Sequence, residues 1–241
     1  MILTTLYDNV SLNPQSSLKE DWGFSLFVQE DGYSILFDTG ANGDILLHNA
    51  KTLSVSFPNK IFISHFHSDH TGGLTTILKK DSIVYYPYSS FDLSETLQKA
   101  GVNSVKINDT LEIYPNVYST GVLPFRSAVN EQALVFQKSN GLILIVGCSH
   151  PGIQNIVDFV TDKFGKSIFL LIGGFHLLGR NRWRIRGIAE NLLEKVNYIA
   201  PSHCTGEAAK KIFKDVFKER FIQNGVGRTI EIKDERLNIK Q

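Results

Sequence analysis

Three imidazoles and one carboxylate occur within six residues, and side chains of these two types bind transition metals. They belong to His65, His67, Asp69 and His70. His65 and His67 alternate, so an extended segment can direct both at one ion, while Asp69 and His70 can face a second ion. The residues that follow, 71–73, are Thr-Gly-Gly and allow a tight turn into a helix. A histidine-rich surface loop is the alternative, but it explains a single His-x-His pair better than this whole string.

Further metal-binding side chains stand directly after apolar runs that are typical of buried strands. Asp38 follows residues 35–37, His65 follows 61–63, His150 follows 143–146, and His203 follows 198–200. If these strand ends lie at one edge of the fold, their side chains converge there. Each histidine alone is as consistent with an ordinary core or surface residue as with a metal ligand, so it is the joint arrangement that favours a metal site.

The pattern of apolar runs and turn residues predicts two similar halves, each with hairpins first and then alternating strands and helices. Strands are expected at 2–7, 24–28, 33–37, 61–63, 83–86, 117–119, 132–137, 142–146, 168–172, 198–200 and 229–232. Helices are expected at 44–51, 74–80, 94–100, 151–162, 183–196 and 207–218. We also expect a loop over 11–21 and a hairpin formed by 105–107 and 111–113. Two such halves predict an α+β fold, a four-layer αββα sandwich that forms a single domain over 1–241.

Length, charge and composition are those of an ordinary soluble globular protein. The 241 residues can bury a substantial core, and 25 Lys and Arg against 24 Asp and Glu give a net charge of +1. This balance argues against a nucleic acid partner. The amino terminus has no basic leader, and no apolar run is long enough to span a membrane, so we expect a cytoplasmic protein without a membrane partner.

The two cysteines, Cys148 and Cys204, each stand beside a candidate ligand histidine. A disulfide framework is not expected from two cysteines in a chain of this length, which favours a reducing compartment. We interpret both as small buried residues rather than as nucleophiles.

The string from His65 to His70 and the order of the other candidate ligands resemble the metallo-β-lactamase superfamily. That resemblance covers nearly the whole chain and implies two divalent metal ions. One ion would be held by His65, His67 and His150. The other would be held by Asp69, His70 and His203, and Asp38 would orient the loop and a ligand histidine. Zinc is favoured by the nitrogen-rich ligand set, and manganese or iron also fit.

One part of the sequence departs from the superfamily pattern. A bridging aspartate is common between the third and last motifs, but here the corresponding segment contains Gly173 and Gly174, followed by Phe175 and His176. Without the bridge, the second ion is expected to bind more weakly or to exchange. His176 is a candidate ligand, general acid or phosphate contact, and the alternative is an ordinary hydrogen-bonded histidine.

The resemblance implies a metal-dependent hydrolase that uses an activated water on a small anionic substrate, either phosphorylated or an ester. Gly-Gly-Phe-His-Leu and His-Cys-Thr-Gly also match a branch of the superfamily with an archaeal dihydropterin ribofuranosylaminobenzene phosphate synthase and many uncharacterised bacterial relatives. A pterin-pathway synthase is therefore one alternative, and a non-catalytic metal-binding protein is another. The diiron electron-transfer relatives carry glutamate where this chain has His67, which argues against a redox function.

Four arginines fall within seven residues, at 180, 182, 184 and 186, soon after His176. In a helix Arg182 and Arg186 share a face, so we predict that this pair binds the anionic group of a small-molecule substrate. The alternative is a solvated basic face of the helix.

Overall fold

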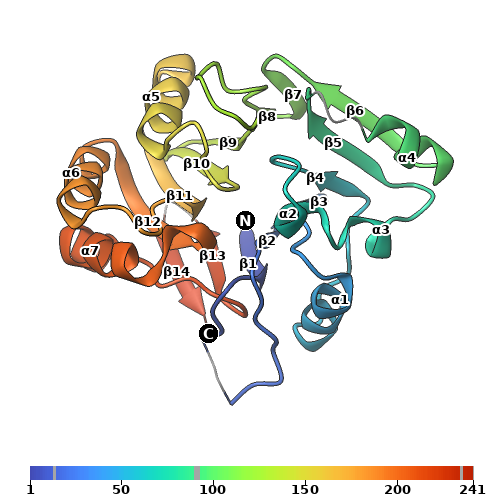
Figure 1. Ribbon diagram of the computed structural model, residues 1–241, viewed down its shortest axis with the longest axis horizontal. Helices are drawn as coiled ribbons and strands as arrows, with labels where there is room; N and C mark the ends of the chain where they lie inside the picture. Colours follow the sequence, from blue (N-terminus) through green and yellow to red (C-terminus); the bar gives the residue numbers. More distant parts are fainter. Residues whose placement is uncertain (13–14, 90–92, 234–235, 241) are drawn as a thin grey trace. The chain divides into compact units, whose positions relative to one another are not determined.

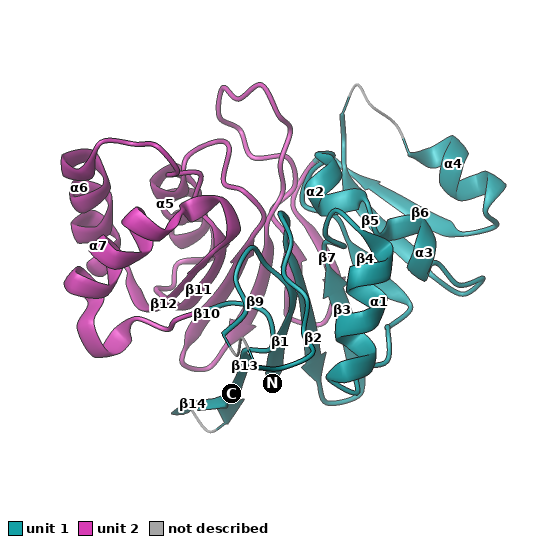
Figure 2. Ribbon diagram, turned by 60° about the horizontal axis from the view of Figure 1, so that its bottom comes forward, with its two compact units in different colours: residues 1–108, 224–241 teal, residues 109–223 magenta. Residues whose placement is uncertain are grey.

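A computed structural model describes residues 1–12, 15–89, 93–233 and 236–240, and the chain divides into two compact units. Unit 1 comprises Met1–Asn108 and Asn224–Gln241, and unit 2 comprises Asp109–Gln223 (Figure 2). Each unit contains a β-sheet and helices of its own (Figure 1). That the whole chain forms one domain stays a prediction. Of the expected loop 11–21, residues 13–14 lie outside the described residues.

The sheet of unit 1 has the strand order β14-β13-β1-β2-β3-β4-β5-β6 within the described ranges. Its strands are β1 (Ile2–Tyr7), β2 (Ser25–Glu30), β3 (Tyr33–Phe37), β4 (Lys60–Phe62), β5 (Ile83–Pro87), β6 (Asn103–Ile107), β13 (Thr229–Lys233) and β14 (Arg236–Lys240). Strands β2 and β3 form the hairpin expected from Asp31-Gly32, and β3 to β6 run parallel. The parallel part places the carboxyl ends of neighbouring strands at one edge.

The helices of unit 1 cover one face of its sheet. They are α1 (Gly43–Thr52), α2 (Ser68–Thr71), α3 (Leu74–Ile77) and α4 (Ser94–Lys99). The Asn42 side chain begins α1 by accepting hydrogen bonds from the backbone N–H groups of the first turn. Leu46 of α1 packs with Leu36 and Ile61 in one core cluster. The next residue along each strand faces the other way because side chains alternate, and the rings of Phe37 and Phe62 stack there at 5.5 Å between centroids.

The sheet of unit 2 has the order β12-β11-β10-β9-β8-β7. Its strands are β7 (Leu111–Tyr114), β8 (Val117–Ser119), β9 (Leu134–Lys138), β10 (Gly141–Val146), β11 (Ile168–Gly174) and β12 (Val196–Ser202). Strands β9 and β10 form the hairpin expected at residues 139–141, and β10, β11 and β12 are parallel. All residues of β10 and β11 are buried, as is usual for strands covered on both faces.

Helices α5 (Ile153–Phe164), α6 (Arg182–Leu193) and α7 (Glu207–Phe217) connect or follow the parallel strands of unit 2, with short 3₁₀ turns η1 (His203–Thr205) and η2 (Lys218–Arg220). Their apolar stripes share one core cluster with the sheet, in which Leu144 packs with Val157, Ile185 and Phe213. Helices α5 and α6 have 12 residues each. No helix in the described part of the chain has the length and hydropathy needed to cross a membrane.

Three sequence-based expectations are wrong in detail. Segments 105–107 and 111–113 do not form a hairpin, because β6 pairs in parallel with β5 while β7 pairs with β8 in the other sheet. Residues 108–110 are therefore the connection from one sheet to the next. The helix that begins at Leu74 ends at Ile77, short of the expected residue 80, and β14 follows the strand that was expected to be the last.

Candidate metal centre

The candidate ligands of unit 1 lie at the carboxyl edge of its parallel strands, as predicted. Strands β3 and β4 are neighbours with Phe37 opposite Phe62, so Asp38 and the segment that begins at Ser64 leave the sheet side by side. His65 and His67 lie in the extended segment after β4, and α2 starts directly after His67. The loop thus changes from extended to helical between its second and third ligands.

Asp38 is the buried anchor of this loop. Its Oδ1 accepts the backbone N–H of Ser64 at 2.7 Å, and its Oδ2 accepts the Ser64 hydroxyl at 2.7 Å. Oδ2 also lies 2.6 Å from Nδ1 of His70, and both side chains are fully buried. The Asp38 backbone is left-handed, with φ of 55°, and its N–H and C=O are bonded to Phe62 and Ser25. A strained backbone held by several bonds is typical of a functional site.

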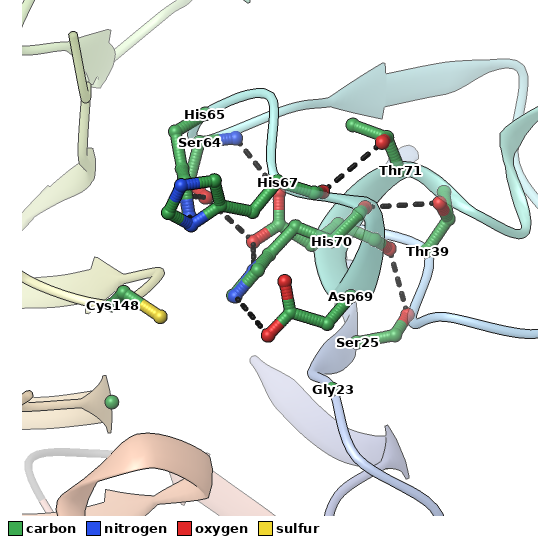
Figure 3. A network of polar contacts seen from close by, with 12 residues as sticks. Gly23, Ser25, Thr39, Ser64, His65, His67, Asp69, His70, Thr71 and Cys148 are labelled. Atoms are coloured by element: carbon green, nitrogen blue, oxygen red, sulfur yellow. Dashed lines mark hydrogen bonds and ion pairs between the residues drawn. The ribbon is translucent and has the colours of Figure 1, made fainter. Parts of the chain in front are cut away.

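The ring nitrogens of the loop are spaced as ligands of a common ion would be. His65 Nε2 lies 3.2 Å from His67 Nδ1, and two nitrogens on a tetrahedral zinc ion at about 2.05 Å lie about 3.3 Å apart. The rings of His65 and His70 are 4.2 Å apart, and His70 Nε2 lies 3.9 Å from a carboxylate oxygen of Asp69 (Figure 3). His65 and His70 are buried and His67 is exposed. The donor set and its spacing fit divalent metal ions.

The two glycines after this loop are required by close packing rather than by an unusual backbone. A Cβ on Gly72 would lie 2.1 Å from the carbonyl oxygen of Ala41, and one on Gly73 would lie 2.3 Å from that of Thr39. Both glycines have negative φ values that any residue adopts. Thr39 also donates its N–H and hydroxyl to the carbonyl of His70 (Figure 3). The expected tight turn is therefore explained by contact between the loop and residues 39–41.

The candidate ligands of unit 2 also follow parallel strands. Val146 of β10 lies opposite Gly173 of β11, and Gly173 lies opposite Pro201 of β12. The segments that carry His150, His176 and His203 therefore leave one edge of this sheet. Left-handed backbone recurs at Ser149, His176 and His203, with φ of 63°, 51° and 45°. Such conformations are uncommon for residues other than glycine, and here they gather beside the candidate ligands.

Glu131 organises the turn after β10, although the sequence pattern does not mark it as a functional residue. Its Oε1 accepts the N–H groups of Cys148 and Ser149 at 2.9 and 2.8 Å, and its Oε2 accepts the N–H of His150 at 2.7 Å. The carboxylate is buried with 1% exposure. The only signal in the sequence was one acidic residue just before a strand, which is too common to single out.

A second cluster in unit 2 contains Cys148, His176 and Cys204. One potential ligand atom from each lies within 4.8 Å of the others, and the rings of His150 and His176 are 4.6 Å apart. A hydrogen bond with Cys204 raises the pKa of His176, against the smaller effects of burial and Arg180. Burial raises the pKa of the Cys204 thiol, but hydrogen bonds from Cys148 and His176 and the charge of His203 bring it well below its usual range.

The segment that lacks the bridging aspartate has no room for one. Gly173 has φ of +130°, and a Cβ there would lie 1.9 Å from the carbonyl oxygen of Val146. A Cβ on Gly174 would lie 2.6 Å from the carbonyl oxygen of Gly147 and 2.7 Å from the sulfur of Cys204. Glycine is therefore a structural requirement of this sheet edge, and neither position can carry a bridging carboxylate.

A cavity of about 310 Å³ opens on unit 2 beside its candidate ligands. Its lining includes His150, His176, Arg180 and Arg184, together with residues 152–155 at the start of α5. The predicted substrate pair is not part of this lining. Arg186 lies 3.5 Å from Glu190 on the exposed side of α6, and Arg182 is exposed at the start of the helix. The role of Arg182 and Arg186 stays a prediction, but the cavity points to Arg180 and Arg184.

Comparison with known proteins identifies the family. A sequence model of the metallo-β-lactamase superfamily matches residues 21–136. The solved structure of Tm1679, described as a metal-dependent hydrolase of the β-lactamase superfamily, has 30% identity and a TM-score of 0.84, and the match covers 97% of this chain and 100% of the other. The chain belongs to the metallo-β-lactamase superfamily, which confirms the predicted fold class. Members of this superfamily usually bind divalent metal ions.

Two further matches are informative. The chain is 27% identical to 7,8-dihydropterin-6-methyl-4-(β-D-ribofuranosyl)-aminobenzene-5′-phosphate synthase of Methanocaldococcus jannaschii, over 95% of this chain and 96% of the synthase. It is also similar in fold to the isothiocyanate hydrolase from Delia radicum gut bacteria, with a TM-score of 0.64 and 14% identity over 96% of this chain and 99% of that one. The synthase agrees with the predicted branch, and the isothiocyanate hydrolase supports the fold alone.

Proposed function

We propose that the protein is a metal-dependent hydrolase that acts on a small phosphorylated or ester substrate. The observation that carries the proposal is the ligand loop of unit 1, in which the imidazoles of His65, His67 and His70 lie together and the buried Asp38 anchors Ser64 and His70. When bound, a pair of divalent ions lowers the pKa of a bound water toward ~7, so that a hydroxide nucleophile is available at neutral pH, and the ions also polarise the phosphoryl or carbonyl group that is attacked.

The proposed roles of the protein residues follow from their contacts. Asp38 accepts a hydrogen bond from Nδ1 of His70, so Nε2 of that ring carries no proton and would be the metal-binding atom. Ser64 holds Nδ1 of His65 at 2.9 Å and so orients that ring in the same way. In unit 2, Glu131 fixes the backbone of His150. Family membership supports the assignment of His65, His67 and His150 to one ion, and of Asp69, His70 and His203 to the other. The nitrogen-rich donor set favours zinc, and manganese or iron also fit.

The substrate class is proposed from the cavity on unit 2. Arg180 and Arg184 bring two guanidinium groups to its wall, and guanidinium pairs with phosphate and carboxylate through two parallel hydrogen bonds. His176 lies in the same wall and would contact the anion or protonate the leaving group. A small anionic molecule fits this volume, and we propose no nucleic acid partner, because the net charge of the chain is only +1.

A substrate screen tests the proposed reaction. Purified protein supplied with Zn²⁺, Mn²⁺ or Fe²⁺ should hydrolyse at least one of four classes, namely phosphomonoesters, phosphodiesters, thioesters or lactones, and chelation should abolish the activity. Elemental analysis should find one to two transition-metal ions per chain. Protein that retains no metal, or that hydrolyses none of these classes when fully metal-loaded, would contradict the proposal.

The second candidate function is a pterin-pathway synthase, because the chain is similar to the archaeal synthase over almost its whole length. The product named for that relative carries a 5′-phosphate, which the same two arginines would bind. Formation of that product by metal-loaded protein, with no hydrolysis of the four ester classes, would favour the synthase over the hydrolase.

The two arginine pairs can be distinguished by paired substitutions. Arg180→Ala with Arg184→Ala should raise KM for a phosphorylated substrate by about 10-fold or more, since charge-assisted hydrogen bonds contribute about 1.5–3 kcal/mol each. Arg182→Ala with Arg186→Ala removes the same charge from the exposed side of α6 and should change KM little. Steady-state kinetics measures KM for both double variants. A larger rise in KM for Arg182→Ala with Arg186→Ala would instead support the pair predicted from the sequence.

A further inference from the structure

We propose that unit 1 binds a small monocarboxylate with an apolar body, such as a medium-chain fatty acid, in a cavity where Arg228 pairs with the carboxylate. None of the residues that line this cavity belongs to the ligand loop or lines the cavity of unit 2. The site is therefore an addition to the proposed reaction, and it does not depend on which ester or phosphate the protein hydrolyses.

The cavity has a volume of about 320 Å³, which is within the range of small-molecule sites. Three segments of unit 1 form it, namely the loop after β1, the carboxyl end of α1, and residues 226–229, which lead into β13. Each segment contributes apolar side chains, which are those of Leu12, Leu18, Leu53 and Val226. The apolar body of a ligand would be removed from water by all three segments, and this burial favours binding.

Arg228 supplies the charge that selects an anion. It is the one charged residue in the lining of the cavity as the described part of the chain forms it, and it is only 8% exposed. Burial lowers the pKa of Arg228, because the charged guanidinium loses contact with water. A carboxylate in the cavity would offset this cost through two parallel hydrogen bonds from the planar guanidinium. One guanidinium matches the single negative charge of a monocarboxylate, whereas a phosphate monoester carries up to about two.

The backbone around Arg228 holds it in the cavity wall. Its C=O accepts the N–H of Thr5 at 2.9 Å, and its N–H donates to the C=O of Gly225 at 3.1 Å. Its Nη1 donates to the backbone C=O of Lys240 at 3.4 Å, which is long for such a bond. That carbonyl is a neutral acceptor, and a carboxylate is the stronger partner for a guanidinium.

Hydrogen bonds beside the cavity already tie its three segments together. Asn49 of α1 accepts the N–H of Lys19 at 2.8 Å and donates to the C=O of the same residue at 2.8 Å, which joins the loop to α1. The N–H of Val226 donates to the C=O of Val10 at 2.8 Å, which joins the loop to the segment before β13. A preformed site of this kind loses little conformational entropy when a ligand binds.

Calorimetric titration of the full chain with octanoate tests the site. The native protein should bind one octanoate per chain and should bind octanol, which has the same apolar body without the charge, at least about 10-fold more weakly. Arg228→Gln should weaken octanoate binding by at least about 10-fold and leave octanol binding unchanged, because the cavity itself remains. Arg236→Gln is the matched control, since it removes the same charge from an exposed position on β14 and should change neither affinity.

Amide chemical shifts locate the ligand without any substitution. In isotope-labelled native protein, octanoate should shift the signals of Thr52, Leu53 and residues 226–229, which line the cavity. This measurement provides the test if Arg228→Gln does not fold. Arg180→Ala with Arg184→Ala should bind octanoate as the native protein does, because those arginines line the cavity of unit 2.

Three outcomes would overturn the proposal. The first is octanoate binding that survives unchanged in Arg228→Gln, or that is no tighter than octanol binding in the native protein. The second is octanoate binding that is lost in Arg180→Ala with Arg184→Ala, with shifts confined to the lining of the unit 2 cavity. The third is no detectable octanoate binding at millimolar concentration. Failure of the substrate screen, by contrast, would overturn the proposed hydrolase and leave this site intact.

Discussion

Protein in which His65 and His67 are both replaced by alanine should retain at least one metal ion fewer per chain and should lose more than about 100-fold in activity. Their facing nitrogens are 3.2 Å apart, close to the separation of about 3.3 Å expected for two nitrogens on one tetrahedral zinc ion. Substitution of residues that only orient a ligand already costs about 10–100-fold in metal affinity, so loss of two ligands should cost more. Elemental analysis of the purified protein and an assay on the substrate found by the screen measure both effects.

The same variant should remain folded. His67 is exposed, and the fully buried His65 ring is the only substantial volume removed, so we expect a loss of about 1–3 kcal/mol in the free energy of unfolding. His48→Ala is the matched control, because His48 lies on α1 in the same unit and bonds the backbone of Ser17. Circular dichroism checks the fold. Full activity in the double variant, with metal content unchanged, would show that the loop is not the metal site.

The parts of the site that the sequence predicts are those set by local pattern. An apolar run followed by a polar residue marks a strand end, and parallel pairing then brings neighbouring ends to one edge. This is why Asp38 and His65 in one unit, and His150 and His203 in the other, are found at the carboxyl ends of parallel strands. The expected placement required no knowledge of packing.

The parts that the sequence does not predict depend on which elements meet in three dimensions. Arg182 and Arg186 share a face of α6, whereas Arg180 precedes the helix, so helical periodicity points to the first pair and cannot single out Arg180. Arg180 and Arg184 become candidates only because both line the cavity of the folded unit. Likewise, 105–107 and 111–113 have the local pattern of a hairpin, but the first segment pairs with β5 in one sheet and the second with β8 in the other.

The two units fix their candidate ligands in the same way, through a buried carboxylate. Each has one buried carboxylate that accepts several hydrogen bonds from the segment carrying its ligands, Asp38 in unit 1 and Glu131 in unit 2. A buried carboxylate is costly unless its oxygens are satisfied, and the ligand segments satisfy them. The cost of burying the charge is thus offset by the same bonds that fix the ligands. Asp38 is visible in the sequence because it ends a strand, whereas Glu131 precedes one.

Asp38→Asn should lower metal affinity by about 10–100-fold while the protein remains folded, with a loss of about 1–3 kcal/mol in the free energy of unfolding. The carboxylate accepts hydrogen bonds from the N–H of Ser64 on Oδ1 and from the Ser64 hydroxyl and the His70 ring on Oδ2. An amide of the same shape keeps the bond to the Ser64 N–H but turns a donor toward His70. The ring then accepts on Nδ1 and carries its proton on Nε2, the nitrogen that must be free of a proton to bind metal.

Competition with a chelator measures the affinity, and chemical denaturation measures the stability. Asp44→Asn is the matched control, because Asp44 is an exposed aspartate in the first turn of α1 and should change neither quantity. If Asp38 served only to stabilise the loop, affinity and stability would fall together in proportion, and a destabilising substitution such as Ser25→Ala would lower affinity equally. If Asp38→Asn and Ser25→Ala destabilise the protein equally but metal affinity falls further in Asp38→Asn, the result shows that Asp38 orients His70 for metal binding.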